Sequence, residues 1–157
     1  MPFIVPAFAS SFTGDFGGDV PAGEKQGDAG KAWAKAIKAG AAGVMAPAPS
    51  SMLSAAESAM SGMLMGWNSD SDSNGAMLKS AIQIFAATMA PGFIGPALVA
   101  VPPAGPPPID GAFPMGEPGG GDINALAMQF GNLLMPWFMT GTHVLPGVPP
   151  VPVPMWL

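Results

Sequence analysis

DINALAMQFGNLLMPWFMT, residues 122–140, is the stretch that most directly predicts the fold. Its apolar side chains recur every three or four residues, the spacing of a helix face, at Ile123, Leu126, Phe130, Leu133, Leu134, Trp137 and Phe138. Asp122 can cap this helix, because its carboxylate accepts hydrogen bonds from the free amides of the first turn. Pro136 should kink the helix or end its regular part. Few polar side chains interrupt it, so we expect it to be buried almost all round in a core, a partner or a membrane.

The residues after this helix form a tail of a different kind. VLPGVPPVPVPMWL, residues 144–157, has no charged side chain and too many prolines for a helix. Because proline fixes φ in advance, an extended segment of this kind docks at a low entropic cost. We therefore predict a Pro-rich arm that docks in a groove of a neighbouring subunit, with a tail that folds back over its own helices and serves only stability as the alternative. The residues expected at interfaces are Trp33, Trp137, Phe138, Val151, Val153 and Trp156.

The composition combines two features that rarely occur together. Glycine and proline, at 22 and 20 of 157 residues, reach the level that is typical of low-complexity chains. However, 49% of the residues are hydrophobic and only 10% are charged, the opposite of a disordered composition. Proline and glycine limit regular structure, so irregular packing or neighbouring subunits must cover much of the apolar surface. We expect a protein that is fully ordered only inside an assembly.

The charged residues argue against nucleic acid as a partner. The net charge is −5, and all five basic residues are lysines. Nucleic-acid-binding proteins neutralise phosphates with clustered lysine and arginine, which this chain lacks. The absence of cysteine also excludes thiolate catalysis, disulfides and Cys-based metal sites.

The composition divides the chain into three parts. Residues 1–23, which begin with two closely spaced prolines and end in a Gly-rich run, are predicted to be an extended arm and loop. Residues 24–143 are predicted to be a helical body, and residues 144–157 the second arm. The fold class is therefore mainly α, with three or four helices and an irregular Pro/Gly connector at 92–121. The expected helices lie near 29–43, 52–65, 76–90 and 123–140.

The helix expected at 29–43 is amphipathic, with Trp33 and Ile37 on its apolar side. The opposite face consists of Lys31, Lys35 and Lys38. We interpret this lysine face as solvated, with contact to an acidic partner surface as the alternative. Ser54 and Glu57 have the spacing of a capping box, which is predicted to start or reinforce the next helix.

A polar segment before the third expected helix resembles the opening of a calcium-binding loop. Asp70, Asp72 and Asn74 have the alternating spacing of the first ligands of such a loop. The pattern then fails, because Leu78 and Ala81 occupy the ninth and twelfth positions, where further ligands are needed. The sequence therefore predicts no metal site, and a calcium-dependent binding module stays as an alternative.

The sequence contains no pattern typical of an enzyme. His143 is the only histidine, and no nucleophile-elbow pattern surrounds any serine. The glycines at 116–121 lead into a helix as in a phosphate-binding loop, but the segment carries acids where a basic residue is needed. We predict neither catalytic residues nor a cofactor.

A membrane-associated or membrane-active protein is a further alternative. Residues 80–109 carry no charge and are numerous enough to cross a bilayer. Prolines at 91 and 96 interrupt this run well short of a full span, and broken backbone at membrane depth must be buried in protein or line a cavity. We therefore do not expect a membrane partner.

Four short patches resemble small virion structural proteins of contractile-tailed bacteriophages. They are MPF at 1–3, GKAWAKAI at 30–37, WFMTGT at 137–142 and PPVP at 149–152. The proteins that this chain resembles are short, rich in alanine, glycine and proline, and built from hydrophobic helices joined by Pro-rich turns. The resemblance implies a non-enzymatic structural component of the virion, in the tail, baseplate or neck. Its implied partners are other virion structural proteins or copies of itself, and no catalytic residue is carried over.

Overall fold

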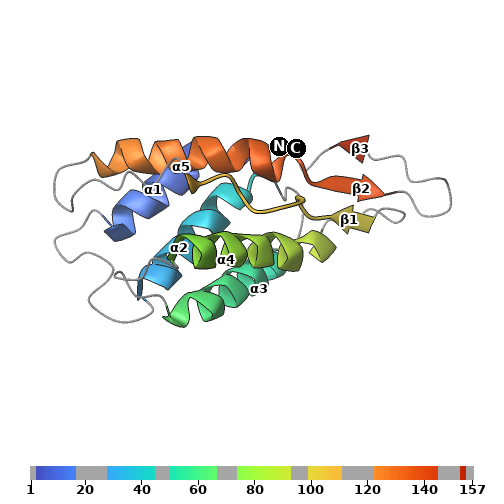
Figure 1. The fold of residues 1–157 in the computed structure, drawn as a ribbon, viewed down its shortest axis with the longest axis horizontal. Coiled ribbons are helices and arrows are strands. Elements are labelled where there is room, and N and C mark those ends of the chain that lie inside the picture. The colour runs from blue at the N-terminus through green and yellow to red at the C-terminus, as the bar shows by residue number, and fades with distance from the viewer. Residues whose placement is uncertain are drawn as a thin grey trace.

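The computed structural model describes residues 3–16, 28–44, 50–66, 74–92, 99–110, 122–144 and 153–154. Within these ranges the chain forms five α-helices and three short strands (Figure 1). The helices are α1 Val5–Phe16, α2 Asp28–Ala41, α3 Ser50–Met63, α4 Asn74–Met89 and α5 Ile123–Phe138. Two 3-10 turns follow α3 and α4, namely η1 Leu64–Gly66 and η2 Ala90–Gly92. The strands are β1 Val99–Val101, β2 Thr142–Val144 and β3 Val153–Pro154.

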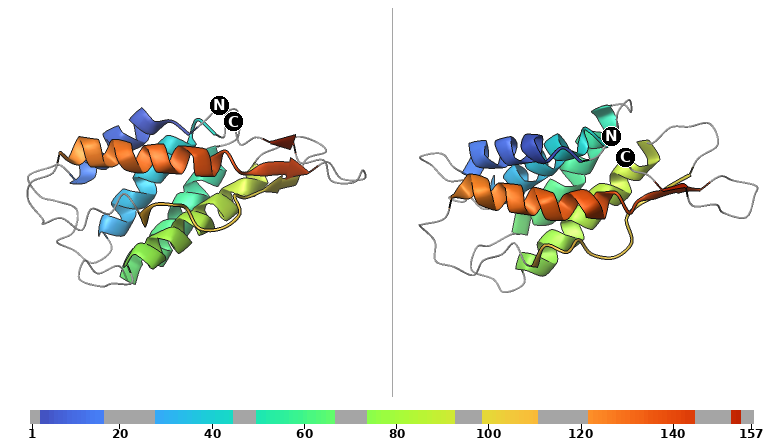
Figure 2. Two further views of the ribbon diagram at one scale, coloured as in Figure 1. Left: turned by 45° about the horizontal axis from the view of Figure 1, so that its top comes forward. Right: turned by 90° about the horizontal axis from the view of Figure 1, so that it is seen from above.

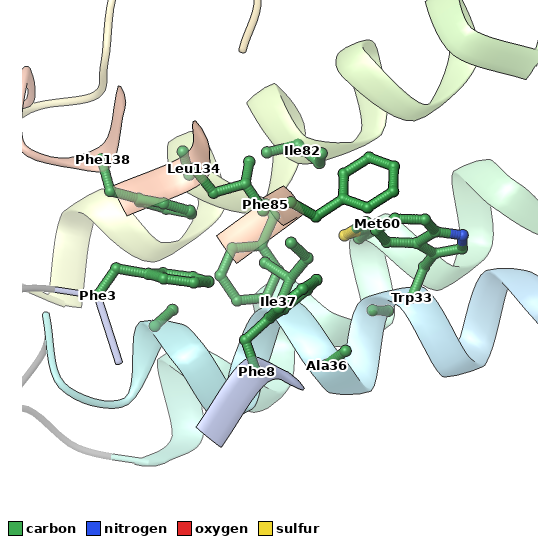
Figure 3. Close-up of a cluster of buried hydrophobic side chains, with 14 of the residues drawn as sticks. Phe3, Phe8, Trp33, Ala36, Ile37, Met60, Ile82, Phe85, Leu134 and Phe138 are labelled. Atoms are coloured by element: carbon green, nitrogen blue, oxygen red, sulfur yellow. The ribbon is translucent and has the colours of Figure 1, made fainter. Parts of the chain in front are cut away.

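The helices pack as a bundle with α2 in the middle. Helix α2 contacts α1 on one side and α3 on the other, while α5 packs on α1 and α4 packs on α3. All five helices contribute to one hydrophobic core, where Figure 3 shows side chains such as Phe8, Ile37 and Phe85 turned toward one another. The core therefore has long-range contacts throughout, and each helix is held by at least one neighbour.

The mainly helical class predicted from the sequence is confirmed. Helices α2 to α5 lie in the four windows where apolar spacing predicted them, with ends that differ by a few residues. The predicted number of helices was too low, because α1 adds a fifth among the described residues.

The prediction of an extended arm at residues 1–23 was wrong, because α1 occupies Val5–Phe16 within it. Pro6 suggested an extended chain, but it stands in the first turn, where a helix needs no amide hydrogen from it. Phe8, Phe12 and Phe16 follow at helical spacing, and the rings of Phe8 and Phe12 are buried. Burial of these rings in the core favours a helix over an extended chain here.

Two glycines allow α1 and the residues before it to approach the other helices. The ring of Phe3 lies where a Cβ of Gly40 in α2 would be. In α5, a Cβ at Gly131 would come within 2.7 Å of Cγ1 of Val5. These close contacts place α1 and the residues before it against both α2 and α5.

Helix α5 begins and ends as its sequence indicates. The carboxylate of Asp122 accepts hydrogen bonds from the amides of Asn124 and Ala125, at 2.9 and 3.3 Å. Pro136 lies inside the last turn, and the helix ends two residues later at Phe138. The hydroxyl of Thr140 then donates to the carbonyl of Trp137, which satisfies one of the free acceptors at this helix end.

The region predicted as an irregular connector, 92–121, contains ordered structure. It includes β1 and a Pro-rich strap, residues 102–110, in which Pro103, Pro107 and Ile109 are buried. The indole Nε1 of Trp137 donates to the carbonyl of Gly105 at 3.2 Å, which ties the strap to α5. Residues 93–98 and 111–121 lie outside the described residues.

The strands form a small antiparallel sheet in the order β1-β2-β3. In β1, Val99, Ala100 and Val101 are opposite Val144, His143 and Thr142 of β2. In β3, Val153 is opposite His143 and Pro154 is opposite Thr142. Figure 2 shows the sheet beyond the end of α5, with β1 near the end of α4. We call this the sheet end of the molecule.

Candidate functional site

Three of the residues predicted at an interface belong to the core of this chain instead. Trp33 and Trp137 are each 5% exposed, and Phe138 is fully buried. The ring of Trp33 packs edge-on against Phe130 at 4.9 Å, and Phe138 stacks on Phe3 at 5.0 Å. The interface prediction for these three is therefore wrong: the apolar surface that they were expected to bury against a partner is covered by α1 and the strap.

The other three predicted interface residues belong to the tail. Val151 and Trp156 lie outside the described residues, so the prediction for them stays a prediction. Val153 lies in β3, which pairs with β2 of the same chain. At this point the tail folds back onto its own chain, whereas the sequence predicted that it docks on a neighbour.

Proline fixes which edge of β3 pairs with β2. Partners in an antiparallel ladder alternate between pairs that exchange two backbone hydrogen bonds and pairs that exchange none. Pro154 has no amide hydrogen, so its pair with Thr142 must be of the second kind. The pair of His143 and Val153 is then of the first kind. The amide of Val153 therefore faces β2, and the outer edge of the sheet has no donor at Pro154.

The same alternation sets the other edge of the sheet. His143 directs its backbone groups to β3, so Thr142 and Val144 direct theirs to β1. The backbone groups of Ala100 consequently face outward, and the next outward position is Pro102, which has no amide hydrogen. Both edges therefore offer few donors to a further strand, as in natural sheets that avoid uncontrolled pairing.

The pairing of β3 is close to energetic balance within one chain. A backbone hydrogen bond contributes about 0.5–1.5 kcal/mol net, and the register gives one pair that exchanges two. Eight residues, 145–152, join β2 to β3, and closing a loop of this length costs roughly 2 kcal/mol before any constant term. Whatever else contacts the tail therefore decides whether it stays on its own β2.

The lysine face of α2 contacts acids of the same chain. Lys35 pairs with Asp15 of α1 at 2.9 Å, and Lys38 pairs with Glu57 of α3 at 2.6 Å. These lysines hold the two neighbours of α2, so the acidic partner surface weighed as the alternative is present inside the chain. Lys31, which is 70% exposed and 3.6 Å from Asp28, fits the solvated interpretation best.

The capping-box prediction was wrong. Helix α3 begins at Ser50, which places Ser54 and Glu57 in its interior. Both side chains accept from the Nζ of Lys38, at 3.1 Å for Ser54 and 2.6 Å for Glu57. The same spacing that suits a cap also puts two acceptors on one helix face, and here that face meets α2.

Charge is separated along the bundle. In Figure 1 the end of α1 and the starts of α2, α4 and α5 lie at the end opposite the sheet, which we call the acidic end. Contacts agree, since Gly30 in α2 packs on Leu64 of η1. Three of the described acids lie at these helix ends, namely Asp15 in α1, Asp28 in α2 and Asp122 before α5.

The described segments at the sheet end carry no charged side chain, and they are 90–92, 99–101 and 139–144. Within the described residues, acids therefore lie at one end of the bundle, and the other end is uncharged. This separation is invisible in the overall composition.

An open groove lies between α1 and α5, with a volume of about 410 Å³. It is lined by small and apolar side chains that include Ser10, Thr13 and Met128. The Thr13 hydroxyl oxygen has no hydrogen-bond partner. None of the groove's lining residues in the described chain is an acid, a base or a histidine, so the groove has no group for proton transfer.

The remaining sequence candidates do not form a site within the described residues. Nowhere there do three acidic or histidine side chains come together as they would at a metal. Asp70 and Asp72 lie outside the described residues, and Asn74 begins α4. His143 is the central residue of β2, opposite Ala100 of β1 on one side and Val153 of β3 on the other. The calcium alternative therefore stays a hypothesis.

Comparisons with protein-family models, with curated proteins and with solved structures found no match. Among the helices that the structure describes, none combines the length and the apolar character needed to cross a membrane. Sequence reasoning missed α1, the strap and β1. The spacing of Phe8, Phe12 and Phe16 was the available signal for α1, whereas nothing local distinguishes a three-residue strand.

Proposed function

We propose that the chain is a non-enzymatic structural subunit of a bacteriophage particle, in its tail or baseplate, and that it joins its neighbours through the sheet end. The separation of charge along the bundle carries this proposal. An uncharged surface has no ionic hydration to lose when another protein covers it, so the sheet end is the less costly end to bury. The core of a protein interface is likewise depleted in charged residues. The acidic end stays in water.

The resemblance to virion proteins of contractile-tailed phages supports the same assignment. The patches that carry it meet in the fold, since Phe3 from the first patch stacks on Phe138 from the third. Trp33 from the second patch belongs to the same core. Packing constrains the sequence at these core positions, so the resemblance supports a similar architecture. The role in a virion is what we propose from it.

The partners in this proposal are other virion structural proteins or copies of this chain. The irregular parts make the contacts, namely the Pro-rich connector and the C-terminal arm. The helices, whose apolar faces are already covered by one another, hold these parts in place.

Substitution at the two ends of the molecule tests this proposal. Val101 at the sheet end is 39% exposed, and Met65 at the acidic end is 64% exposed, so lysine at either position leaves the core intact. Wild-type protein should be found by mass spectrometry in particles purified from cells that produce it. Val101→Lys should lower incorporation at least tenfold, since it places a charge in the buried interface, and Met65→Lys should not.

The matched pair also defines the outcomes that count against the proposal. Wild-type protein missing from purified particles would exclude a virion role. Equal incorporation of both variants, with unchanged circular dichroism, would exclude the sheet end as the joining surface. Flotation with lipid vesicles would favour the membrane alternative, and a saturable calcium titration of the purified chain would favour the calcium alternative.

A further inference from the structure

We infer that the C-terminal strand is exchanged between copies, so that Val153–Pro154 of one chain pairs with β2 of a second copy in the register seen within a single chain. This inference rests on the proposed function, in which the chain is a subunit of an assembly, and it names one partner as another copy. The segment that moves is the tail, and the surface that receives it is the β3-facing edge of β2 at Thr142 and His143.

Exchange of the tail between copies loses no contact of β3. The contacts of β3 with the described elements are concentrated on β2, outside the helical core. A tail from a second copy presents the same residues to the same edge, which is why exchange of identical elements is an inexpensive route to association. In an assembly the neighbouring tails are also held at a high effective concentration.

The sequence between β2 and β3 also favours exchange. Residues 145–152 include four prolines, at positions 146, 149, 150 and 152. Each proline fixes φ near one value, so fewer conformations of this stretch return the tail to its own β2. A tail that arrives from a neighbour has no such reversal to make. Prolines therefore disfavour the closed arrangement without weakening the pairing itself.

An exchanged tail does not recruit a further strand. Once β3 of a second copy is in place, its outer edge has no donor at Pro154, and the alternation continues in the sequence with Pro152. Proline at the edge of a sheet prevents a further strand from adding. The tail can thus link two subunits without starting uncontrolled growth of the sheet.

The absence of cysteine from the chain allows a direct test with two introduced thiols. Thr142 and Pro154 are opposite one another in the register, where the Cβ atoms of an antiparallel pair are close enough for a disulfide. Thr142→Cys and Pro154→Cys are made in separate, differently tagged chains that are produced together, so that tails can exchange while the chains fold. The control mixture replaces Thr142→Cys with Ser58→Cys, an exposed position on α3.

Exchange predicts a disulfide-linked heterodimer between the two variants, at least tenfold more abundant than in the control mixture. Peptide mapping by mass spectrometry should place the link between positions 142 and 154. A chain that carries both substitutions should likewise form linked dimers or larger species. The inference is overturned if that chain closes its disulfide internally while the mixture gives no more dimer than the control.

Failure of either disulfide to form would also overturn the inference, because β2 and β3 would then not pair at all. The measurement uses purified protein and no particle. Its failure therefore leaves the incorporation experiment with Val101→Lys unaffected, and a chain missing from particles leaves the disulfide result unaffected.

Discussion

The helical body and the sheet end of this protein are both rich in apolar residues, but they are stabilised in different ways. In the body, large side chains such as Phe8, Phe85 and Phe138 are fully buried among five helices. At the sheet end, strands of two or three residues pair through their backbones beyond the helices. The helical core unfolds cooperatively and is formed by one chain. The pairing of so few strand residues, in contrast, is stable only with support from neighbouring structure. The comparison predicts which substitutions unfold the protein and which only disconnect it.

The largest effect should come from Phe8→Ala. The ring of Phe8 is fully buried and packs against Phe3, Phe12 and Trp33. Its removal should lower the free energy of unfolding by about 3–5 kcal/mol, the cost of truncating a core aromatic residue. Urea unfolding followed by circular dichroism measures this. Ile4→Ala, at a position 38% exposed, is the control and should cost far less. If Phe8→Ala lowers the free energy of unfolding as little as Ile4→Ala does, α1 is a peripheral arm.

A smaller loss should follow from Gly40→Ala, which adds a methyl group where the ring of Phe3 lies. Overpacking of this kind costs about 1–3 kcal/mol. Gly62→Ala is the matched control, because it makes the same change in α3 with no neighbouring atom within 4 Å. There, alanine should stabilise the helix by up to about 1 kcal/mol. The same urea titration measures both variants, and the changes in the free energy of unfolding should have opposite signs. A loss at both positions would contradict the close contact.

The difference between the two regions also explains what the sequence could predict. Helices α2 to α5 follow from apolar spacing, and the cap at Asp122 follows from its side chain, since both signals are local. The α1 helix was missed because Pro6 was given more weight than the spacing of Phe8 and Phe12. Position within a helix decides what a proline does, and sequence alone does not give that position.

Features that depend on partners distant in the sequence could not be predicted. An apolar helix face looks the same whether a partner or its own chain covers it, so Trp33 and Trp137 were assigned to an interface. Ser54 and Glu57 matched a local motif, but Lys38 of another helix binds them. The sheet joins strands more than forty residues apart, and its register follows from no local pattern. Its assignment as a candidate joining surface therefore required the structure.

Deletion of the tail should affect the sheet end and leave the helical body unchanged. Deletion of residues 145–157 leaves β2 intact but removes its partner β3. The helical circular dichroism should be unchanged, and the free energy of unfolding should fall by about 1 kcal/mol or less, because the pairing is nearly offset by loop closure. Incorporation into particles should nevertheless be lost. If helicity decreases together with incorporation, the tail is part of the core and the distinction between the regions does not hold.

The smallest effect should be the contribution of the salt bridges that hold α2 in the body, and it can be measured by a double-mutant cycle with Lys38→Met and Glu57→Gln. The two side chains are about one-third exposed and 2.6 Å apart, so solvent screens their attraction only partly. We expect a coupling of about 0.5–1 kcal/mol, the upper range for such pairs, which should decrease as salt is added. Lys31 and Asp28 provide the control, because this pair is more exposed and 3.6 Å apart, and its coupling should be close to zero. If the two pairs couple equally, the lysine face is solvated as the sequence first suggested, and α2 is held by its apolar face alone. If only the inner pair couples, and incorporation of both variants is normal, the charges of the body act within the chain, and the neighbours are joined through the uncharged end.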